Sequence, residues 1–337
     1  MPVPLYPPFI LEENLSPGPF GPDVDEACEQ IHAATKGWGA NKQKVIDALA
    51  TQDLTKRTHI YLRYQELYNK DLKDLMKSEF SGDFGNALQL LSLPPHMAEC
   101  VMIHKACKGI GANVNIVWSV MLGRTNPEMD LLKKTFYKMY SKDLGKLLAS
   151  ELHGNMERLV FNAMQGGEEA YDTQFHTPDK AREDAEAIHS MGQGKWFGTD
   201  EKGIFKILCA APKERLENIN KYYSDKYGYT LTKAMEKELN GMGESNLQQA
   251  TLYLIGMKLK PSETMANLIK YACAGMGTDE LLLTCCLIRY QLCMGEVQAA
   301  HIELFGKTLH ERVRKECGGK FRALLLQVLN AVWPEEG

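Results

Sequence analysis

The sequence predicts an all-α protein built from four copies of one five-helix unit, preceded by a proline-rich arm. Apolar residues recur at spacings of three and four along most of the chain, as on the buried face of a helix, for example at Ala27, Ile31 and Ala34. The two-residue alternation typical of half-buried strands is nearly absent. The length of 337 residues also exceeds the usual span of one hydrophobic core, so we expect several domains or a repeated unit.

Composition excludes several classes of protein. Lys and Arg (39) nearly balance Asp and Glu (43), and the net charge of -4 argues against binding to nucleic acid or acidic lipid by the chain's own positive charge. The nine cysteines are an odd number, lie mostly in apolar stretches and form no CxxC pair. They are typical of small buried side chains in a reducing compartment, and they support neither a zinc site nor a disulfide framework.

The amino-terminal stretch lacks the basic start and unbroken apolar run of a signal peptide. No run of about 18 uncharged apolar residues appears elsewhere, so we expect no membrane-spanning hydrophobic helix and a cytoplasmic location. Seven of the fourteen prolines fall in residues 1–22, which predicts an extended arm anchored by Phe9, Ile10 and Leu11.

Three elements recur in register four times from residue 23 onward. Each repeat contains a glycine turn, an aromatic residue 28 or 29 positions after the last glycine of that turn, and a glutamate eleven positions after the aromatic. The turn reads GxG in repeats one, two and four and WFG in repeat three, and its last glycines are Gly39, Gly111, Gly198 and Gly277. The aromatic residues are Tyr68, Tyr140, Tyr227 and Phe305, and the glutamates are Glu79, Glu151, Glu238 and Glu316.

These elements divide the chain into an arm, four repeats and one linker. Repeats one to four cover 23–93, 94–165, 181–259 and 260–337. The linker, 166–180, is the longest connection and suggests two pairs of repeats. In repeat one, the apolar spacing and the residues that begin and end helices predict helices at about 24–36, 41–51, 55–69, 71–80 and 83–91. Each helix is too short to be stable alone, so the five must pack together.

The glycine turn and the glutamate together suggest a calcium site. Glycines at positive φ turn successive carbonyl oxygens outward, and a glutamate adds a carboxylate. Calcium accepts six to eight such oxygens, but one carboxylate leaves the site cationic, so the affinity should be weak until a lipid phosphate completes the shell. Alternatively, the glycines only end a helix and the glutamates only face solvent. Four copies in register favour the calcium site.

The repeat resembles that of the annexin family, K-G-x-G-T-D followed about 40 residues later by E-x-x-G. The resemblance implies a curved disc whose calcium loops, on the convex face, bind acidic phospholipids. It places the metal-binding carbonyls on Thr35, Gly37 and Gly39; Cys107, Gly109 and Gly111; Gly194, Trp196 and Gly198; and Cys273, Gly275 and Gly277. The matching carboxylates are Glu79, Glu151, Glu238 and Glu316.

Some positions depart from the family pattern. Repeats one and two read Gly-Ala-Asn where the family has Gly-Thr-Asp, although Asn41 and Asn113 can still cap the next helix. Repeat three carries an extra residue, which would shift its carbonyls by one, and ECGG in repeat four lacks the usual serine or threonine. The arm and the divergent loops are similar to those of the alpha-giardins, protist annexins associated with the cytoskeleton and flagella.

The residue before the last turn glycine is apolar in every repeat. We expect these side chains to touch the membrane at the level of the headgroups, with folding back onto the helix ends as the alternative. They are Trp38, Ile110, Phe197 and Met276.

The sequence thus predicts calcium-dependent binding to acidic phospholipid, peripheral on inner membrane surfaces, linking membrane and cytoskeleton. The alternative is a cytoskeletal or flagellar scaffold whose repeats mediate protein contacts or self-association, with calcium secondary. No convergent acid, base or nucleophile set indicates an enzyme. His104, His153 and His301 stand singly in helical context, which suggests surface or capping positions.

Overall fold

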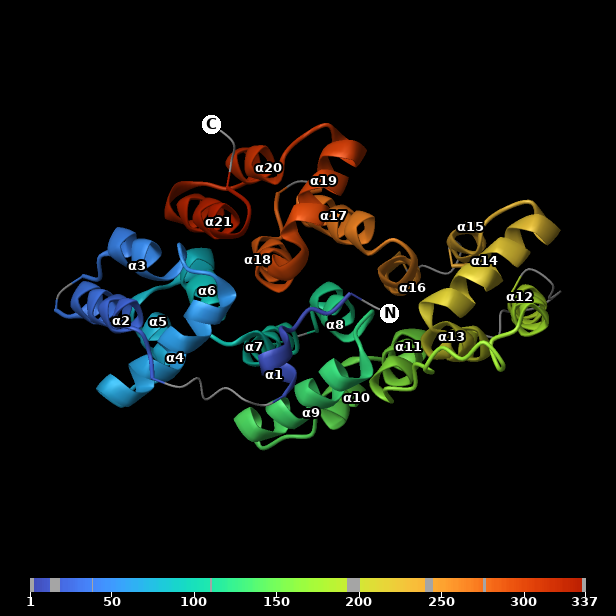
Figure 1. Ribbon diagram of the computed structural model, residues 1–337, viewed down its shortest axis with the longest axis horizontal. Coiled ribbons are helices and arrows are strands. Elements are labelled where there is room, and N and C mark those ends of the chain that lie inside the picture. Colours follow the sequence, from blue (N-terminus) through green and yellow to red (C-terminus); the bar gives the residue numbers. More distant parts are fainter. Residues whose placement is uncertain are drawn as a thin grey trace. The chain divides into compact units, whose positions relative to one another are not determined.

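The computed structural model describes residues 3–12, 19–37, 39–109, 111–192, 201–239, 245–274 and 277–334. All regular secondary structure in these ranges is helical, which confirms the predicted all-α class (Figure 1). The chain forms two compact units. Unit 1 comprises Met1–Pro4 and Ile103–Thr264, and unit 2 comprises Leu5–Met102 and Met265–Gly337.

The helices of repeat one match their predicted bounds to within two residues. They are α2 (Pro22–Thr35), α3 (Lys42–Leu49), α4 (Leu54–Tyr68), α5 (Leu72–Glu79) and α6 (Gly82–Leu91). The side chains of Asn41, Asp53 and Asp71 accept hydrogen bonds from the first turns of α3, α4 and α5. Each cap satisfies a backbone N–H that has no partner within its own helix, and so defines where that helix begins.

The other three repeats follow the same order of five helices. Repeat two contains α7 (Pro95–Ala106), α8 (Val114–Met121), α9 (Asn126–Tyr140), α10 (Leu144–Glu151) and α11 (Gly154–Met164). Repeat three contains α12 (Pro178–Met191), α13 (Glu201–Ala210), α14 (Lys213–Tyr227), α15 (Leu231–Glu238) and α16 (Ser245–Leu259). Repeat four contains α17 (Pro261–Ala272), α18 (Glu280–Arg289), the 3-10 turn η1 (Gln291–Cys293), α19 (Met294–Phe305), α20 (Leu309–Glu316) and α21 (Gly319–Val332).

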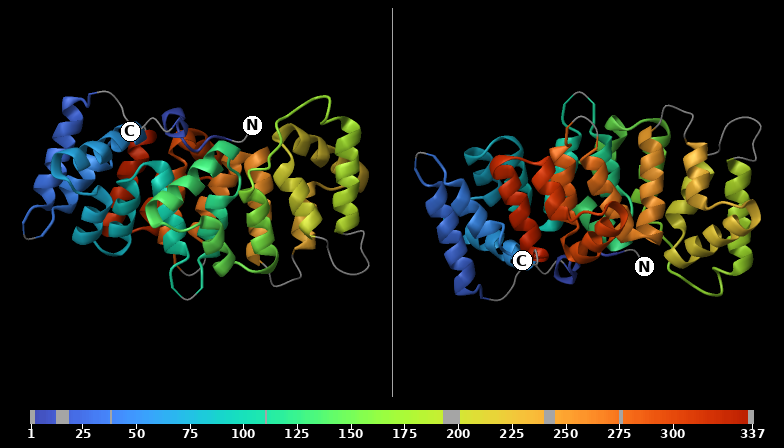
Figure 2. Two further views of the ribbon diagram at one scale, coloured as in Figure 1. Left: turned by 90° about the horizontal axis from the view of Figure 1, so that it is seen from below. Right: turned by 90° about the horizontal axis from the view of Figure 1, so that it is seen from above.

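The compact units pair repeats that are not neighbours in the chain. Unit 2 combines repeat one with repeat four, since α18 packs against α6, and α21 packs against both α3 and α6 (Figure 1). Unit 1 combines most of repeat two with repeat three (green to orange in Figure 2), through contacts of α11 with α13 and of α8 with α16. The linker therefore lies inside unit 1. Its length suggested pairs of sequence neighbours, whereas apolar helix faces from distant segments decide the packing.

The arm is tied to unit 2 by buried side chains. Pro8–Leu11 form a short helix, α1, where the prolines suggested an extended arm. Ile10 is buried as predicted, but Leu5 and Tyr6 are the other anchors, while Phe9 and Leu11 are only half-buried. The Tyr6 hydroxyl donates to the carboxylate of Glu99, which also accepts from Nε of Arg289 at 2.6 Å.

The cysteines confirm their predicted role as buried side chains. All nine are free thiols and all nine are buried. Burial raises the pKa of the Cys28, Cys209 and Cys317 thiols to about 12. Because the thiolate is the reactive form, these cysteines are poor nucleophiles.

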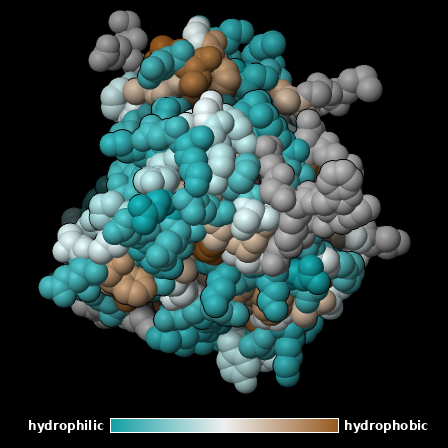
Figure 3. Space-filling model, turned by 90° about the vertical axis from the view of Figure 1, so that its right-hand side faces the viewer, coloured by the Kyte–Doolittle hydropathy of each residue, from teal (hydrophilic) through white to brown (hydrophobic). Residues whose placement is uncertain are grey.

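No helix among the described residues is long and apolar enough to cross a bilayer. The face of the molecule in Figure 3 is mostly hydrophilic where its residues are described, with apolar residues in separate small groups. That face therefore offers no broad apolar surface to lipid tails.

Candidate calcium-binding loops

The glycines of the GxG turns adopt backbone conformations that other residues avoid. The φ angles are 98° at Gly37 and 82° at Gly39, 113° at Gly109 and 81° at Gly111, and 113° at Gly277. A methyl group placed on any of these glycines would meet no atom within 4 Å. The backbone angle, and not a lack of space, therefore requires glycine here.

The same hydrogen bond closes the loop in three repeats. The cap residue of the second helix donates its backbone N–H to the carbonyl oxygen seven residues earlier, at 2.8 Å in each case: Asn41 to Ala34, Asn113 to Ala106 and Asp279 to Ala272. The side chains of Asn41, Asn113 and Asp279 also accept from the first turn of that helix. This confirms that the two asparagines can replace aspartate as caps.

Loop closure leaves the predicted carbonyl ligands unused. Among the described residues, no hydrogen bond ends on the carbonyl oxygens of Thr35, Gly37, Gly39, Cys107, Gly109, Gly111, Cys273 or Gly277. The five glycines of this set are exposed. Gly194, Trp196, Gly198 and Gly275, the other predicted carbonyl ligands, lie outside the described residues. In the described loops, backbone oxygens thus remain available to a cation from outside.

Each of the four glutamates is the last residue of the fourth helix of its repeat: Glu79 ends α5, Glu151 ends α10, Glu238 ends α15 and Glu316 ends α20. This common position places every carboxylate at the carboxyl end of the fourth helix. Glu79 is exposed there, and the other three are half-buried.

Two of these carboxylates lie beside the loop of their own repeat, and a third, Glu238, lies beside Gly192 at the end of the first helix of repeat three. The Thr278 hydroxyl donates to the backbone carbonyl of Glu316 at 3.4 Å. Burial first, and then the charge of Glu316, raises the pKa of the Cys273 thiol to about 11. Burial and the charge of Glu151 likewise raise the pKa of the Cys107 thiol to about 12. A methyl group on Gly192, at the end of α12, would lie 3.1 Å from Cδ of Glu238.

This donor set fits a hard cation. No group of three or more His, Cys, Asp or Glu side chains that could hold a metal occurs among the described residues, so a loop cation would rely on backbone carbonyls and one carboxylate. Oxygen ligands of this kind suit calcium and not zinc, which prefers nitrogen and sulfur. The predicted membrane-contact residues Trp38, Ile110, Phe197 and Met276 lie outside the described residues.

A repeated ring stack below the loops escaped the sequence analysis. A histidine near the end of the first helix stacks on the recurring tyrosine that ends the third helix. The pairs are His32 with Tyr68, His104 with Tyr140, and His189 with Tyr227, at centroid distances of 4.1, 4.2 and 3.8 Å. His104 is therefore not the single histidine that was expected. The sequence could have revealed this stack, because His32 and His104 each lie seven residues before the last glycine of their turn.

His301 is a second correction, because a surface or capping position was expected and the side chain is fully buried. Its Nδ1–H donates to the carbonyl of Lys307 at 2.7 Å, and its Nε2 accepts from Nε of Arg312 at 2.8 Å. These two bonds require the neutral ring protonated at Nδ1. His153, by contrast, does precede a helix and is exposed, as expected.

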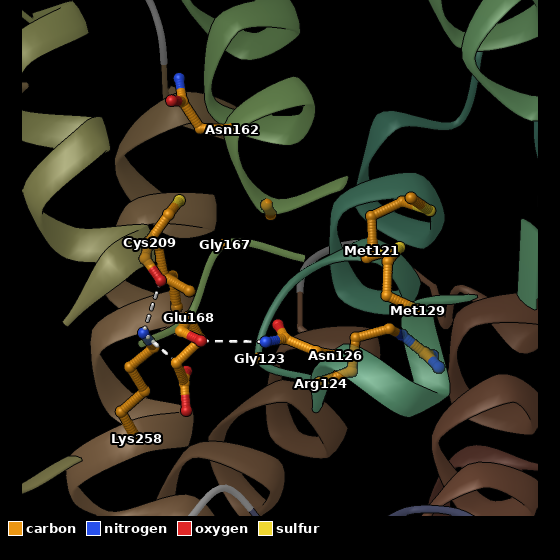
Figure 4. A pocket seen from close by; sticks show the side chains of 12 residues that line it. Met121, Gly123, Arg124, Asn126, Met129, Asn162, Gly167, Glu168, Cys209 and Lys258 are labelled. Atoms are coloured by element: carbon orange, nitrogen blue, oxygen red, sulfur yellow. Dashed lines mark hydrogen bonds and ion pairs between the residues drawn. The ribbon is translucent and has the colours of Figure 1, made fainter. Parts of the chain in front are cut away.

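A cavity in unit 1 offers no alternative ligand site. It measures about 20 Å³, enough for roughly one water molecule. Lys258 lies beside it, and its ammonium donates to the carbonyl of Cys209 and pairs with Glu168 (Figure 4). The ammonium also donates to the carbonyls of Leu208 and Ala211. The polar groups around this ammonium are therefore already engaged.

Comparison with known proteins identifies a family that matches most of the chain. The family model described as Annexin matches residues 26–91, 98–162 and 183–248. The chain is 29% identical to annexin A13 of Homo sapiens over 314 residues, covering 93% of this chain and 97% of that protein. It is 28% identical to annexin A7 of Dictyostelium discoideum over 309 residues, covering 91% of this chain and 65% of that protein.

Solved structures agree on the fold. A structure of annexin A8 superposes with a TM-score of 0.83 at 25% identity, covering 93% of this chain and 96% of that one. Calcium-bound alpha-14 giardin superposes with a TM-score of 0.74 at 18% identity, covering 90% and 99%.

Proposed function

The chain belongs to the annexin family, whose members bind calcium, and we propose that it attaches to acidic phospholipid membranes in a calcium-dependent, peripheral manner. In each repeat, loop carbonyls and one glutamate hold the ion. An oxygen of the lipid phosphate completes its coordination shell. In repeats two and four, the ligands include Cys107, Glu151, Cys273 and Glu316.

The observation that carries this proposal is the set of free carbonyl oxygens in loops of the same construction. Three repeats close the loop with the same 2.8 Å hydrogen bond. In each repeat this bond uses the carbonyl oxygen of an alanine and none of the carbonyl oxygens that would bind the ion. If glycine served only to end a helix, the same closing hydrogen bond and the same unused carbonyl oxygens would not be expected in three repeats. The recurrence therefore favours a function for the loops.

Charge explains why the membrane must be acidic. One glutamate neutralises half of the charge of a calcium ion, so an occupied loop stays cationic. The ion remains short of oxygens, and a lipid phosphate supplies both an oxygen and the missing negative charge. Calcium and lipid should therefore strengthen each other's binding, since each binds better to the complex with the other.

Vesicle co-sedimentation tests this directly. Vesicles of phosphatidylcholine with phosphatidylserine should pellet the protein in calcium and release it in EGTA, whereas vesicles of phosphatidylcholine alone should not pellet it. Pelleting that is equal with and without calcium would contradict the proposal. Pelleting with microtubules or actin filaments in EGTA would instead support a cytoskeletal scaffold.

Substitution of the glutamates identifies the loops involved. Glu151→Gln and Glu316→Gln should each raise the calcium concentration required for half-maximal pelleting, because the ion loses a carboxylate. Glu303→Gln, on the exposed face of α19, removes the same charge away from any loop and should change nothing. Crystals soaked at millimolar calcium should show the ion in repeat four and in at least one of repeats one and two.

A further inference from the structure

Repeat four contains a basic pocket beside its calcium loop. Cys273 and Glu316, the proposed calcium ligands of this repeat, line one part of it, but calcium binding gives no role to its cationic side chains. The pocket has a volume of about 500 Å³ and lies where α17, α19 and α20 meet. Four cationic side chains and one carboxylate line it: Lys270, Lys307, Arg312, Lys315 and Glu316. This excess of positive charge stands out in a chain whose net charge is -4.

Arg312 is held in place by one hydrogen bond and a ring contact, and its two terminal nitrogens can still donate hydrogen bonds. Its residue is only 6% exposed, and its Nε donates to the buried ring of His301. Its guanidinium also lies 5.8 Å from the ring centroid of Phe305. Among the described residues, its two terminal nitrogens have no hydrogen-bond partner. A fixed guanidinium whose two terminal nitrogens are free is suited to donating two parallel hydrogen bonds to an anion.

Three of the four cations of the pocket have no carboxylate partner among the described residues. Among the described residues, no carboxylate lies within 4 Å of the charged nitrogens of Lys270, Lys307 or Arg312. Lys315 reaches Glu316 only at 3.7 Å. A largely buried arginine without a carboxylate partner is costly to keep, and an anion in the pocket would offset that cost.

Comparison with the other repeats shows that Arg312 and Lys270 are specific to repeat four, whereas Lys307 has counterparts in Lys70 and Lys142 of repeats one and two. The positions equivalent to Arg312 hold apolar residues, namely Leu75, Leu147 and Ala234. The positions equivalent to His301 hold Tyr64, Phe136 and Tyr223, and those equivalent to Lys270 hold the stacked histidines His32, His104 and His189. Repeat four has thus replaced a stacked ring pair and an apolar contact by cations.

We propose that this pocket binds a phosphomonoester group carried by a small polyhydroxylated molecule, and that it does so without calcium. Arg312 holds two phosphate oxygens, while Lys270 and Lys307 neutralise the remaining charge. A volume of about 500 Å³ is in the range of small-ligand sites and accommodates a phosphorylated sugar or inositol ring. The proposal goes beyond calcium bridging, since cationic side chains hold the phosphate directly and no metal ion takes part, although the pocket adjoins the calcium ligands Cys273 and Glu316.

The test is made on the full chain in EGTA, in two arms that separate the sources of the phosphate. In the first, titration calorimetry measures binding of inositol trisphosphate and of inorganic phosphate. In the second, co-sedimentation uses phosphatidylcholine vesicles containing phosphatidylinositol bisphosphate. Arg312→Leu installs the residue of repeats one and two. Arg182→Leu, on the exposed face of α12, is the control with the same change of charge.

We expect binding in at least one arm, weakened about tenfold or more by Arg312→Leu and unchanged by Arg182→Leu. Lys307→Ala, at an exposed position, should weaken it as well and guards against a folding defect in Arg312→Leu. Binding of the free compounds alone assigns a soluble ligand, and binding of the vesicles alone assigns a lipid headgroup. No binding in either arm, or equal binding by all variants, would overturn the proposal. Calcium-dependent pelleting with phosphatidylserine should survive Arg312→Leu, so the two proposals can fail separately.

Discussion

At the scale of single residues, Lys258 shows how one buried charge holds several segments together. Its ammonium lies 2.6 to 3.0 Å from three carbonyl oxygens at the end of α13 and just beyond it, and 2.8 Å from the carboxylate of Glu168 in the linker. The residue is 3% exposed. The three carbonyls lie where a helix has no internal partners for them, so the lysine acts as a cap supplied from α16.

Replacing Lys258 should therefore be costly. Lys258→Met keeps most of the side-chain volume but leaves the half-buried Glu168 without its counter-charge, which in buried pairs costs about 3–5 kcal/mol. Urea unfolding should show this loss. Lys206→Met, on the exposed face of α13, is the control and should stay within about 0.5 kcal/mol of the parent. Equal stability of the two variants would show that the contacts of Lys258 contribute no net stability.

His301 should make stability depend on pH. Burial, followed by the nearby charges of Arg312 and Lys270, lowers the pKa of His301 below its ordinary value, although the bond to the Lys307 carbonyl opposes the shift. An unfolded histidine has a pKa of about 6.5, so below that pH the unfolded chain binds a proton that the folded chain excludes. The contribution of His301 is thus complete above about pH 6.5 and is lost as the pH falls toward its folded pKa, at no more than about 1.4 kcal/mol per pH unit.

The free energy of unfolding, measured as a function of pH, tests this assignment. In His301→Gln, the decline below about pH 6.5 should be smaller than in the parent, since glutamine carries no titrating group. His153→Gln, at an exposed position, should leave the decline unchanged. A parent protein whose decline is the same as that of His301→Gln would exclude His301 as its cause.

At the scale of elements, the loops combine a strained backbone with open space. Gly111 has a φ of 81° and room for a methyl group. Gly111→Ala should cost about 1–2 kcal/mol, the penalty of a left-handed conformation, and no clash should add to it. Gly167 also has room and has no positive φ, so Gly167→Ala should be nearly neutral in the same unfolding experiment. A neutral Gly111→Ala would mean that the loop can adopt another conformation.

The helices were predictable because their signals are local. Apolar spacing and the caps Asn41, Asp53 and Asp71 lie within the segments they define. The pocket of repeat four was not predictable. A search for repeats finds the residues that the four copies share, whereas Arg312 is present in repeat four alone. The environment of His301 also depends on residues outside α19, among them Arg312 of α20, which come together only in the folded chain. The pairing of repeats one and four depends on packing between segments some 200 residues apart. The spacing of residues within a segment does not predict such contacts.

At the scale of the whole molecule, charge separates the two proposed modes of membrane contact. Four bound calcium ions would bring eight positive charges to a chain of net charge -4, all of them in loops. In EGTA those charges are absent, and the positive charge in the proposed second mode comes from the pocket of repeat four. Exposed charges are screened within about 10 Å at 0.1 M salt, whereas an ion bound directly to both partners is screened much less.

Vesicle binding should therefore respond differently to salt in the two conditions. Raising sodium chloride from about 0.1 M to about 0.5 M should abolish most pelleting with phosphatidylinositol bisphosphate in EGTA, while most pelleting with phosphatidylserine in calcium should remain. Co-sedimentation across this range measures both. Equal sensitivity to salt would argue that calcium acts through general electrostatic attraction and not as a bridge.

The division into compact units also bears on how the chain is made. Apart from its first four residues, unit 1 is one continuous segment, Ile103–Thr264, while unit 2 needs residues from both sides of it. During translation, the interior unit can therefore collapse as soon as its last helix leaves the ribosome. Repeat one, although synthesised first, must wait for α18 and α21 to reach it. A stalled or truncated product should thus expose the apolar faces of α3 and α6, the surface that a chaperone would have to cover.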